Sequence, residues 1–309
     1  MVTENQEQIK TRYVYNFDEL DRAPEGPCSA TVTPRRLISG SKTLATSKAT
    51  STGAVITGER FHVALVWKPR GTGSKVHTHP NEQFNYVLQG TLIADIDGQV
   101  LLVPKGHVIH IPAGMPHSHV STAEEDVFFF AAKDTRYGIT GPAVDGKHDG
   151  PRYLPGFYQP SFGTPGSNQW DVGADGLPEP QTQNHTGRRV RYVYNIRALD
   201  EVPEGDCSVT VTPRGDVSKK SSSFGGALTG QKLRVELVHM ARGSCSKPHA
   251  QSYEQFNWVL QGTLLGEVDG QQVQVPERSI LHLPEGIVHT TAASPGEDLT
   301  LYVVKPASA

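Results

Sequence analysis

Four side chains between residues 77 and 117 have the types and the spacing of a metal site. His77 and His79 lie two residues apart and Gln83 follows at a further even spacing, so a strand would place all three on one face. His117 follows a Gly-rich hairpin stretch and ends the turn PAGMPH. Imidazoles suit zinc, copper, iron and nickel, whereas oxygen donors suit harder ions such as manganese. The pattern therefore predicts that these residues hold one divalent transition metal, with Fe, Mn, Ni, Co and Zn all left open.

The chain contains an internal repeat, which indicates two related domains. TRYVYNFDELDRAPEGPCSATVTPR recurs 179 positions later as VRYVYNIRALDEVPEGDCSVTVTPR, and EQFNYVLQGTL recurs 172 positions later as EQFNWVLQGTL. A repeat of this length outranks local signals in the assignment of a fold. We predict an N-terminal domain with a lead-in strand over residues 1–135, a connecting segment over 136–189 and a C-terminal domain over 190–309.

Two stretches differ from the repeated pattern. The first copy has seven more residues, within the Ser/Thr/Gly-rich stretch from Arg35 to Gly58, which predicts a surface loop or, as the alternative, a lid over the first site. The connecting segment is dense in Pro, Gly and aromatic residues. Because a disordered linker seldom carries so many aromatic side chains, we expect an ordered crossing that packs on a barrel surface. Its aromatic residues are Tyr153, Phe157, Tyr158, Phe162 and Trp170.

Both copies show short strand patterns and no helical periodicity. FHVALVWKP and LRVELVHMA are rich in Val and Leu that alternate with polar residues, and each copy has an Asp-Gly pair between strand residues, which is a strong hairpin signal. No segment shows sustained apolar spacing of 3.6 residues over a dozen positions. With 31 Gly and 22 Pro for turns, the chain is predicted to be all-β.

The motifs of the first copy resemble those of the cupin superfamily, and the repeat resembles a bicupin. The first motif matches at Gly71, His77, His79, Gln83 and Gly90, and the second at Pro112, Gly114 and His117. The resemblance implies two double-stranded β-helix barrels, of the jelly-roll type, in tandem.

Two departures from the family pattern concern the metal. The usual Glu ligand is Gln83 here. The neighbouring Glu82 lies at an odd spacing from both histidines, so we expect it on the outer face or at the contact between domains. In the second copy the four positions read His249, Gln251, Gln255 and His289. Because an amide is a poorer donor to a transition metal than an imidazole, we expect this second site to be weak or empty.

Three further residues are candidates for catalysis at the first site. His110, which is repeated in the second copy, is expected to be either a packed core histidine or a pocket-facing acid or base. His119 shares strand parity with His117 and is not repeated. Asn85 shares the parity of Gln83, so it would donate a hydrogen bond inside the pocket or satisfy groups at the strand end.

Three neutral imidazoles and a neutral amide leave a bound metal with its full double charge. This favours Lewis-acid work, such as polarising a carbonyl or acidifying a hydroxyl. The resemblance implies a non-oxidative lyase, isomerase or cyclase that acts on a small hydroxy, keto or aromatic metabolite. Two alternatives stay open: an iron-dependent dioxygenase that cleaves an aromatic ring or a diketone, and a bicupin that binds a small molecule without catalysis.

Composition sets the remaining expectations. The net charge is −3 and no basic cluster stands out, so a small-molecule substrate is predicted, without nucleic acid or membrane partners. The N-terminus MVTENQEQIK is too polar for a signal peptide. The three cysteines form no CxxC motif, which predicts free thiols in a reducing compartment. We therefore predict a cytoplasmic protein, and leave open whether copies of the chain form homo-oligomers.

Overall fold

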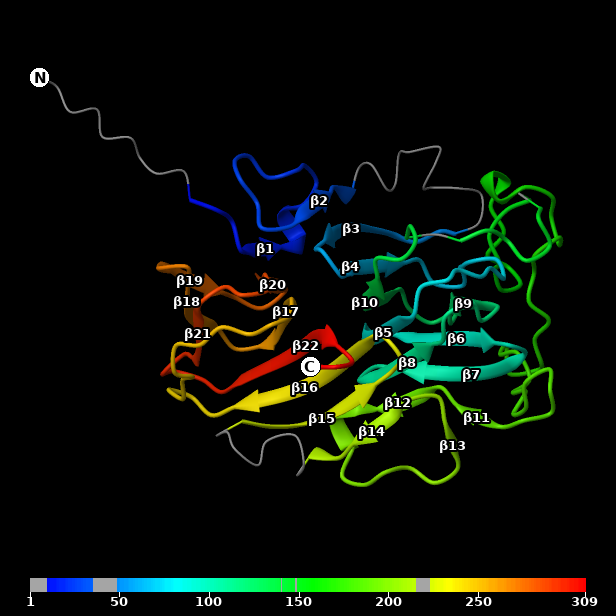
Figure 1. Cartoon of the computed structure of the whole chain (residues 1–309). Helices are drawn as coiled ribbons and strands as arrows, with labels where there is room; N and C mark the ends of the chain where they lie inside the picture. Colours follow the sequence, from blue (N-terminus) through cyan, green and yellow to red (C-terminus); the bar gives the residue numbers. More distant parts are fainter. Residues whose placement is uncertain (1–9, 36–48, 140, 148, 215–222) are drawn as a thin grey trace, which may run out of the picture.

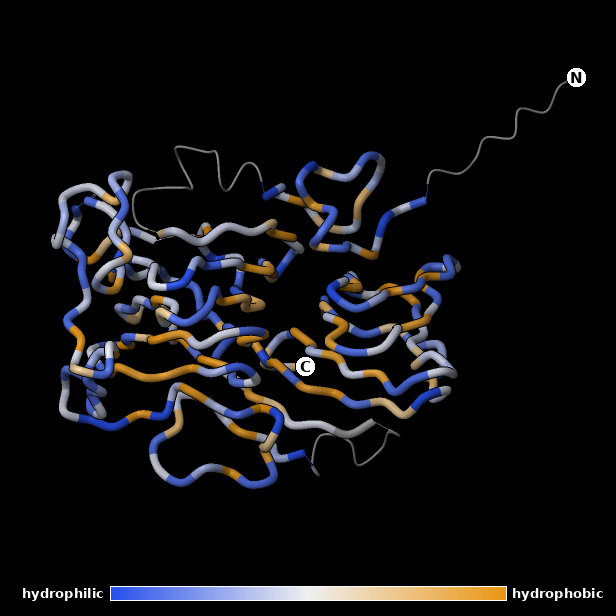
Figure 2. Tube along the Cα trace, turned by 180° about the vertical axis from the view of Figure 1, so that it is seen from behind, coloured by the Kyte–Doolittle hydropathy of each residue, from blue (hydrophilic) through white to orange (hydrophobic). Residues whose placement is uncertain are grey.

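Two β-barrels lie side by side in the computed structural model, as predicted (Figure 1). The structure describes residues 10–35, 49–139, 141–147, 149–214 and 223–309. The predicted loop or lid falls largely on residues 36–48, which lie outside the described residues. In Figure 2, hydrophobic positions follow the strands of both barrels and hydrophilic positions gather in the peripheral loops. None of the described helices is long and apolar enough to span a bilayer.

The first barrel consists of a seven-stranded sheet in the order β12-β8-β5-β10-β4-β3-β2 and a three-stranded sheet in the order β7-β6-β9. All pairs in both sheets are antiparallel. Its strands from the first copy are β2 (Thr31–Thr33), β3 (Thr52–Thr57), β4 (Phe61–Lys68), β5 (Gln83–Gln89), β6 (Thr91–Ile96), β7 (Gln99–Pro104), β8 (His107–Ile111), β9 (His117–Ser121) and β10 (Val127–Asp134).

The second barrel repeats this plan, with sheets in the orders β1-β20-β17-β22-β16-β15-β14 and β19-β18-β21. Its strands from the second copy are β14 (Thr210–Thr212), β15 (Ser223–Thr229), β16 (Leu233–Met240), β17 (Gln255–Gln261), β18 (Leu264–Val268), β19 (Gln271–Val275), β20 (Ser279–Leu283), β21 (His289–Ala293) and β22 (Leu299–Pro306). The predicted hairpins form at the Asp-Gly pairs. Asp97 and Gly98 have φ of 50° and 89°, and Asp269 and Gly270 have 52° and 73°, as type I′ turns require.

The two copies exchange their lead-in strands. β1 (Val14–Asn16) pairs with β20 of the second barrel, and β12 (Val193–Asn195) pairs with β8 of the first. A short 3-10 helix follows each of these strands, η1 (Phe17–Glu19) and η3 (Ile196–Ala198), and the side chain of the preceding Asn caps each helix. Each barrel is therefore completed by a strand from the other copy.

One aromatic core joins the barrels. Tyr86 of β5 stacks on Tyr302 of β22 with ring centroids 5.0 Å apart, and Phe130 of β10 lies 4.9 Å from Trp258 of β17. Phe17 of η1 packs on Trp258 at 5.0 Å. Full burial of such a ring contributes about 1.5–3 kcal/mol, so this contact ties the barrels together strongly.

Two buried glutamates form a reciprocal clasp across the same contact. The Glu82 carboxylate accepts hydrogen bonds from the backbone amides of Gln231, Lys232 and Leu233 in the turn between β15 and β16, at 2.8–2.9 Å. His110 adds a bond from Nε2 at 2.9 Å. Burial alone would raise the pKa of Glu82, but the bonds from His110 and the amides lower it, so the carboxylate is charged.

The second copy makes the mirror arrangement. Glu254 accepts from the backbone amides of Glu59 and Arg60 in the turn between β3 and β4, at 2.7 and 2.8 Å, and from His282 at 2.8 Å. The turn glycine is required because the carboxylate approaches the backbone closely. A Cβ at Gly58 would lie 2.0 Å from Glu254 Oε1. The expectation that Glu82 lies at the contact between domains is therefore confirmed.

The connecting segment packs on the first barrel, as the aromatic content predicts. It contains η2 (Pro160–Phe162), and β11 (Val190–Arg191), which pairs in parallel with β13 (Asp206–Cys207), directly follows it. Leu154 and Trp170 bury against Ile93 and Val120 of the smaller sheet. The guanidinium of Arg152 lies 3.3 Å from the centroid of the Trp170 ring. The segment is thus an ordered part of the barrel wall.

Candidate metal centre

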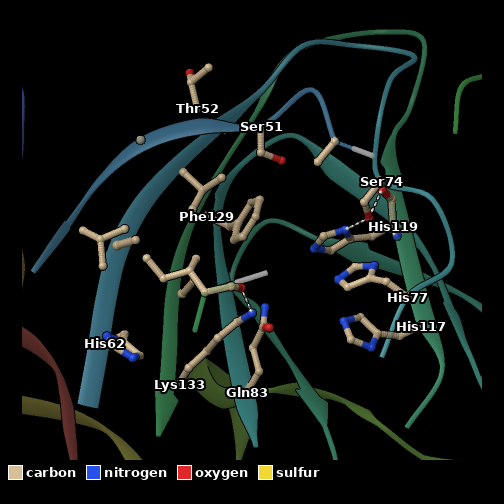
Figure 3. Close-up of a pocket in the computed structure, with 17 residues that line it drawn as sticks. Ser51, Thr52, His62, Ser74, His77, Gln83, His117, His119, Phe129 and Lys133 are labelled. Carbon is tan, nitrogen blue, oxygen red and sulfur yellow. Dashed lines mark hydrogen bonds between the residues drawn. The ribbon is translucent and has the colours of Figure 1, made fainter. Parts of the chain in front are cut away.

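Three imidazoles converge at one end of the first barrel. Their ligand atoms all lie within 4.8 Å of one another, and the ring centroids of His77 and His117 are 4.2 Å apart (Figure 3). His117 starts β9. His77 and His79 lie in the irregular segment before β5 rather than in the expected strand, but His77 exchanges two backbone hydrogen bonds of 2.9 Å with His117. This local bridge brings the rings together.

The hydrogen bonds of the rings leave one nitrogen of each histidine for a metal. Nδ1 of His77, His79 and His117 lies 2.8, 3.0 and 2.8 Å from the backbone carbonyls of Lys75, Asn81 and Met115, respectively. Because a carbonyl only accepts, each Nδ1 carries the proton and each Nε2 keeps a lone pair, which in His79 faces Lys133 Nζ at 3.2 Å. Such outer hydrogen bonds orient metal-binding imidazoles.

The three histidines are held in the neutral form that binds metal. Burial lowers the pKa of His77 to about 3 and that of His79 to about 4, and the positive charge of Lys133 adds to both effects. Burial also lowers the pKa of His117 well below its ordinary value. A preformed set of deprotonated donors fits a divalent transition metal.

Gln83 stands beside the imidazoles at the start of β5. Its Oε1 lies 3.1 Å from His79 Nε2, and its Nε2 donates to Asn85 Oδ1 at 2.7 Å. Asn85 thereby turns the amide so that its oxygen faces the site. Asn85 Nδ2 also lies 3.4 Å from Nε2 of His119, whose Nδ1 lies 3.2 Å from Ser74 Oγ. The structure thus places Asn85 and His119 directly beyond the proposed ligands.

His110 lies elsewhere, which corrects the pocket-facing placement considered from the sequence. Its Nε2 donates to Glu82, and its Nδ1 lies 2.9 Å from Ser208 Oγ of the second copy. Phe84 packs on its ring at 4.7 Å. Residues on β8 alternate between faces, and His110 faces the other barrel. We therefore do not propose an acid or base role for it.

A cavity of about 140 Å³ adjoins the histidines. For scale, an apolar cavity of roughly 150 Å³ holds a benzene molecule. Its polar lining comprises Ser51, Thr52, His62, Ser74, His77, Gln83, His117, His119 and Lys133, and its apolar lining comprises Ala49, Gly53, Val55, Ala64, Val66, Phe129, Ala131 and Ile139. Most of the surface that these residues expose to the cavity is apolar, so the polar groups at the histidine end would orient a bound molecule.

Lys133 is a pocket residue that the sequence reasoning missed. It is buried near the end of β10 and points into the cavity (Figure 3). Its Nζ donates to the Ile139 carbonyl at 2.6 Å and lies 3.2 Å from His79 Nε2. The available signal was its alternation with Phe129 and Ala131, which line the same cavity. A charged residue at an inward position of an apolar run indicates a functional interior.

The corresponding site of the second barrel is less complete. His249 and His289 keep the backbone bridge, and their ring centroids lie 4.3 Å apart. Gln255 donates to Asn257 at 2.7 Å, as Gln83 does to Asn85. His249, however, is exposed, and Gln251 replaces the third imidazole. Within the described ranges, His77, His79 and His117 form the only cluster of three or more His, Cys, Asp or Glu side chains with such close ligand atoms.

Comparison with known proteins agrees with this geometry. The cupin domain family matches the chain twice, over residues 65–132 and 236–305, and the chain has two barrels of that type. The chain therefore belongs to the cupin superfamily and is a bicupin. The His77, His79 and His117 cluster fits a cupin metal site. No curated protein sequence matches the chain.

Several solved structures share the fold at low sequence identity. A variant of oxalate decarboxylase from Bacillus subtilis is 13% identical, with a TM-score of 0.57 over 96% of this chain and 77% of that one. A Cupin 2 conserved barrel domain protein from Leptotrichia buccalis is 13% identical, with a TM-score of 0.51 over 96% and 97%. AerE from Microcystis aeruginosa is 14% identical, with a TM-score of 0.51 over 83% and 92%. These similarities show the fold alone.

Proposed function

We propose that the first barrel is a metal-dependent enzyme that acts on a small hydroxy, keto or aromatic compound by non-oxidative chemistry, as a lyase, isomerase or cyclase. The observation that carries this proposal is the convergence of three neutral imidazoles and Gln83 beside a small cavity. One structural neighbour is named a decarboxylase, which is a lyase, and this is consistent with the proposal.

Some residues of the first barrel would bind the metal, and others would exclude water from the cavity. His77, His79, His117 and Gln83 would hold the metal, which supplies Lewis acidity when it is bound. All four ligands are neutral, so they would not reduce that acidity by charge. The apolar wall formed by Val66, Phe129 and Ala131 excludes water from the cavity, which strengthens polar interactions inside it.

A proton donor lies within the same cavity. Ser74 and Asn85 fix the two ring nitrogens of His119, and Lys133 presents its ammonium group beside His79. These groups would hold a substrate oxygen near the ligands or exchange a proton with it. Asn85 in turn keeps the Gln83 oxygen aimed at the site, so it is a positioning residue.

The experiment is metal analysis of the purified protein followed by a panel of small hydroxy, keto and aromatic compounds with and without oxygen. The proposal expects about one tightly held metal per chain and turnover that does not consume oxygen. Oxygen consumption coupled to turnover would instead identify the dioxygenase alternative. Bound metal without turnover across the panel would favour a non-catalytic binder.

Gln83→Glu gives a second test of the Lewis-acid reading. The carboxylate keeps an oxygen donor but adds a negative charge next to the ion, so the variant should retain metal and turn over more slowly. Equal or faster turnover in Gln83→Glu would argue against neutral ligation as the basis of the activity.

A further inference from the structure

Two buried lysines on the inner face of the first barrel have no carboxylate partner. Lys133 on β10 is bonded to a backbone carbonyl, and Lys68 on β4 is completely buried with Nζ donating to Ser51 Oγ at 2.8 Å. Among the residues that the structure describes, neither forms an ion pair. Burial disfavours the ammonium form of a lysine that has no anionic partner and lowers the pKa of both side chains to about 7, so a bound anion would favour the charged form.

The strand register places both lysines on the inner face of the first barrel, but only Lys133 lines the cavity. His62, Ala64 and Val66 of β4 line the cavity, and Lys68 continues this alternation. In the antiparallel pair of β4 and β10, Lys133 is opposite His62. The lysines are therefore separated by six positions along the strands, or roughly 20 Å between Cα atoms. Lys133 therefore lies at one end of the cavity, and Lys68 lies farther along β4, beyond the residues that line it.

The cavity itself contains no compensating charge. Its 17 lining residues include neither Asp nor Glu. Three neutral imidazoles and an amide add no negative charge at the Lys133 end, and a divalent metal there would make that end more positive. The electrostatic potential of the empty cavity therefore favours an anionic occupant.

In the second barrel, the lysine at the corresponding position has an anionic partner within the protein. Lys305, the counterpart of Lys133, lies 3.0 Å from the carboxylate of Glu236. Glu236 occupies the position of Ala64 and also accepts from Arg234 at 2.6 Å. Met240 occupies the position of Lys68. The interior lysine is thus neutralised within the second barrel but not within the first.

We propose that the cavity of the first barrel binds a small organic carboxylate, of the 2-hydroxy or 2-oxo acid class, with the carboxylate held by the Lys133 ammonium group beside the metal ligands. The inference deepens the proposed function and rests on it for turnover, although binding is tested separately. The cavity volume suits an occupant of about the size of benzene. Lys68 lies outside the cavity lining, and Met240 occupies the corresponding position in the second barrel.

The test compares lactate with its neutral isostere lactamide by calorimetry on the full chain loaded with Zn²⁺. Lactate should bind at least tenfold more tightly than lactamide. Lys133→Met should abolish this preference, and Lys133→Arg should restore most of it. Lys305→Met, which alters the counterpart in the second barrel, should keep the preference. Lys68→Met should reduce it by a smaller factor.

Zinc content and the melting temperature of each variant separate loss of the anion site from loss of metal or fold. The same comparison in metal-free protein should show a weaker preference for lactate that still depends on Lys133. Equal affinity for the two compounds, absence of binding by both, or a preference that survives Lys133→Met would overturn the inference. Preference for lactate in a protein that neither retains metal nor turns over would refute the proposed function alone.

Discussion

The two barrels share one architecture but have different interiors. In the first, Ala64 and neighbouring apolar side chains leave a cavity beside three imidazoles. In the second, Arg234, Glu236 and Lys305 form ion pairs at the corresponding positions. The clasp glutamates, the strand exchange and the aromatic contact are nearly symmetric. In this fold, a few substitutions at inward-facing positions therefore separate a barrel with a cavity from a barrel with a filled core.

The largest expected effect comes from removing one matched imidazole in each barrel. His117 and His289 are 1% and 3% exposed, and Nδ1 of each faces a backbone carbonyl, so the structural cost of replacement should be similar. His117→Ala should weaken metal binding by at least roughly a hundredfold, because loss of an outer partner alone costs tenfold to a hundredfold. It should also abolish turnover. His289→Ala should retain both. Metal content after dialysis and turnover check this, and the reverse outcome would assign the metal to the second barrel.

The clasp glutamates offer the next comparison. Glu82→Gln and Glu254→Gln each remove a buried charge that accepts several backbone amides, and each should lower the free energy of unfolding by about 3–5 kcal/mol. Only Glu82→Gln should also weaken metal binding, because Glu82 fixes the start of the strand that carries Gln83. Urea unfolding and Co²⁺ titration measure the two effects. Equal loss of metal affinity in both variants would contradict the positioning role.

Restoring the missing imidazole in the second barrel tests the difference between the two metal sites. Gln251→His would complete a set with His249, Gln255 and His289, whose backbone bridge is already in place. We expect metal affinity at the second site to rise roughly tenfold to a hundredfold, and stoichiometry to approach two per chain at saturating metal. Calorimetry with Gln251→Ala as the control checks this. No additional metal would mean that exposure, rather than the missing donor, separates the two sites.

The last prediction concerns pH. The folded pKa values of His77 and His79, about 3 and 4, lie below the unfolded value of about 6.5. Below pH 6.5 the unfolded chain therefore binds more protons, and metal-free protein should lose stability as pH falls toward about 4. The loss is on the order of 2 kcal/mol per histidine between pH 6.5 and 5.

Melting temperatures at pH 7 and pH 5, in the presence of a chelator, measure this dependence. His77→Gln with His79→Gln should show a shallower fall than the wild-type chain. Because the folded site stays deprotonated, it should also retain metal below pH 6, where histidines of ordinary pKa would release it. An unchanged pH slope in the double variant would show that other groups set the acid sensitivity.

Much of the fold and of the site was predictable because the motif residues stand at characteristic distances from one another in the sequence. The repeat, the Asp-Gly hairpins and the histidine pattern all correspond to features of the structure. The strand exchange was not predictable, and the reason is physical. Residues 13–16 and 192–195 both read YVYN, so local sequence cannot distinguish which barrel each strand completes.

The functional interior was harder to predict than the ligands. His110 and His119 both lie on strands near the ligands, but only the register of β8 against β5 and β12 directs His110 toward the other barrel. Lys133 ends an apolar run, where a charged residue usually marks the strand end rather than a cavity. Long-range packing decides the placement of His110, whereas for Lys133 the alternation with Phe129 and Ala131 was a weak local signal.

The strand exchange has a consequence for how such a chain tolerates change. A chain with one copy of the repeat would complete its barrel only by pairing with a second, identical copy, as in a domain-swapped dimer. Covalent linkage replaces that bimolecular encounter with an intramolecular one at high effective concentration. The two halves are then always paired with each other and need not be identical. One half is free to lose its ligands and fill its interior, while the other keeps a complete partner for its own strand.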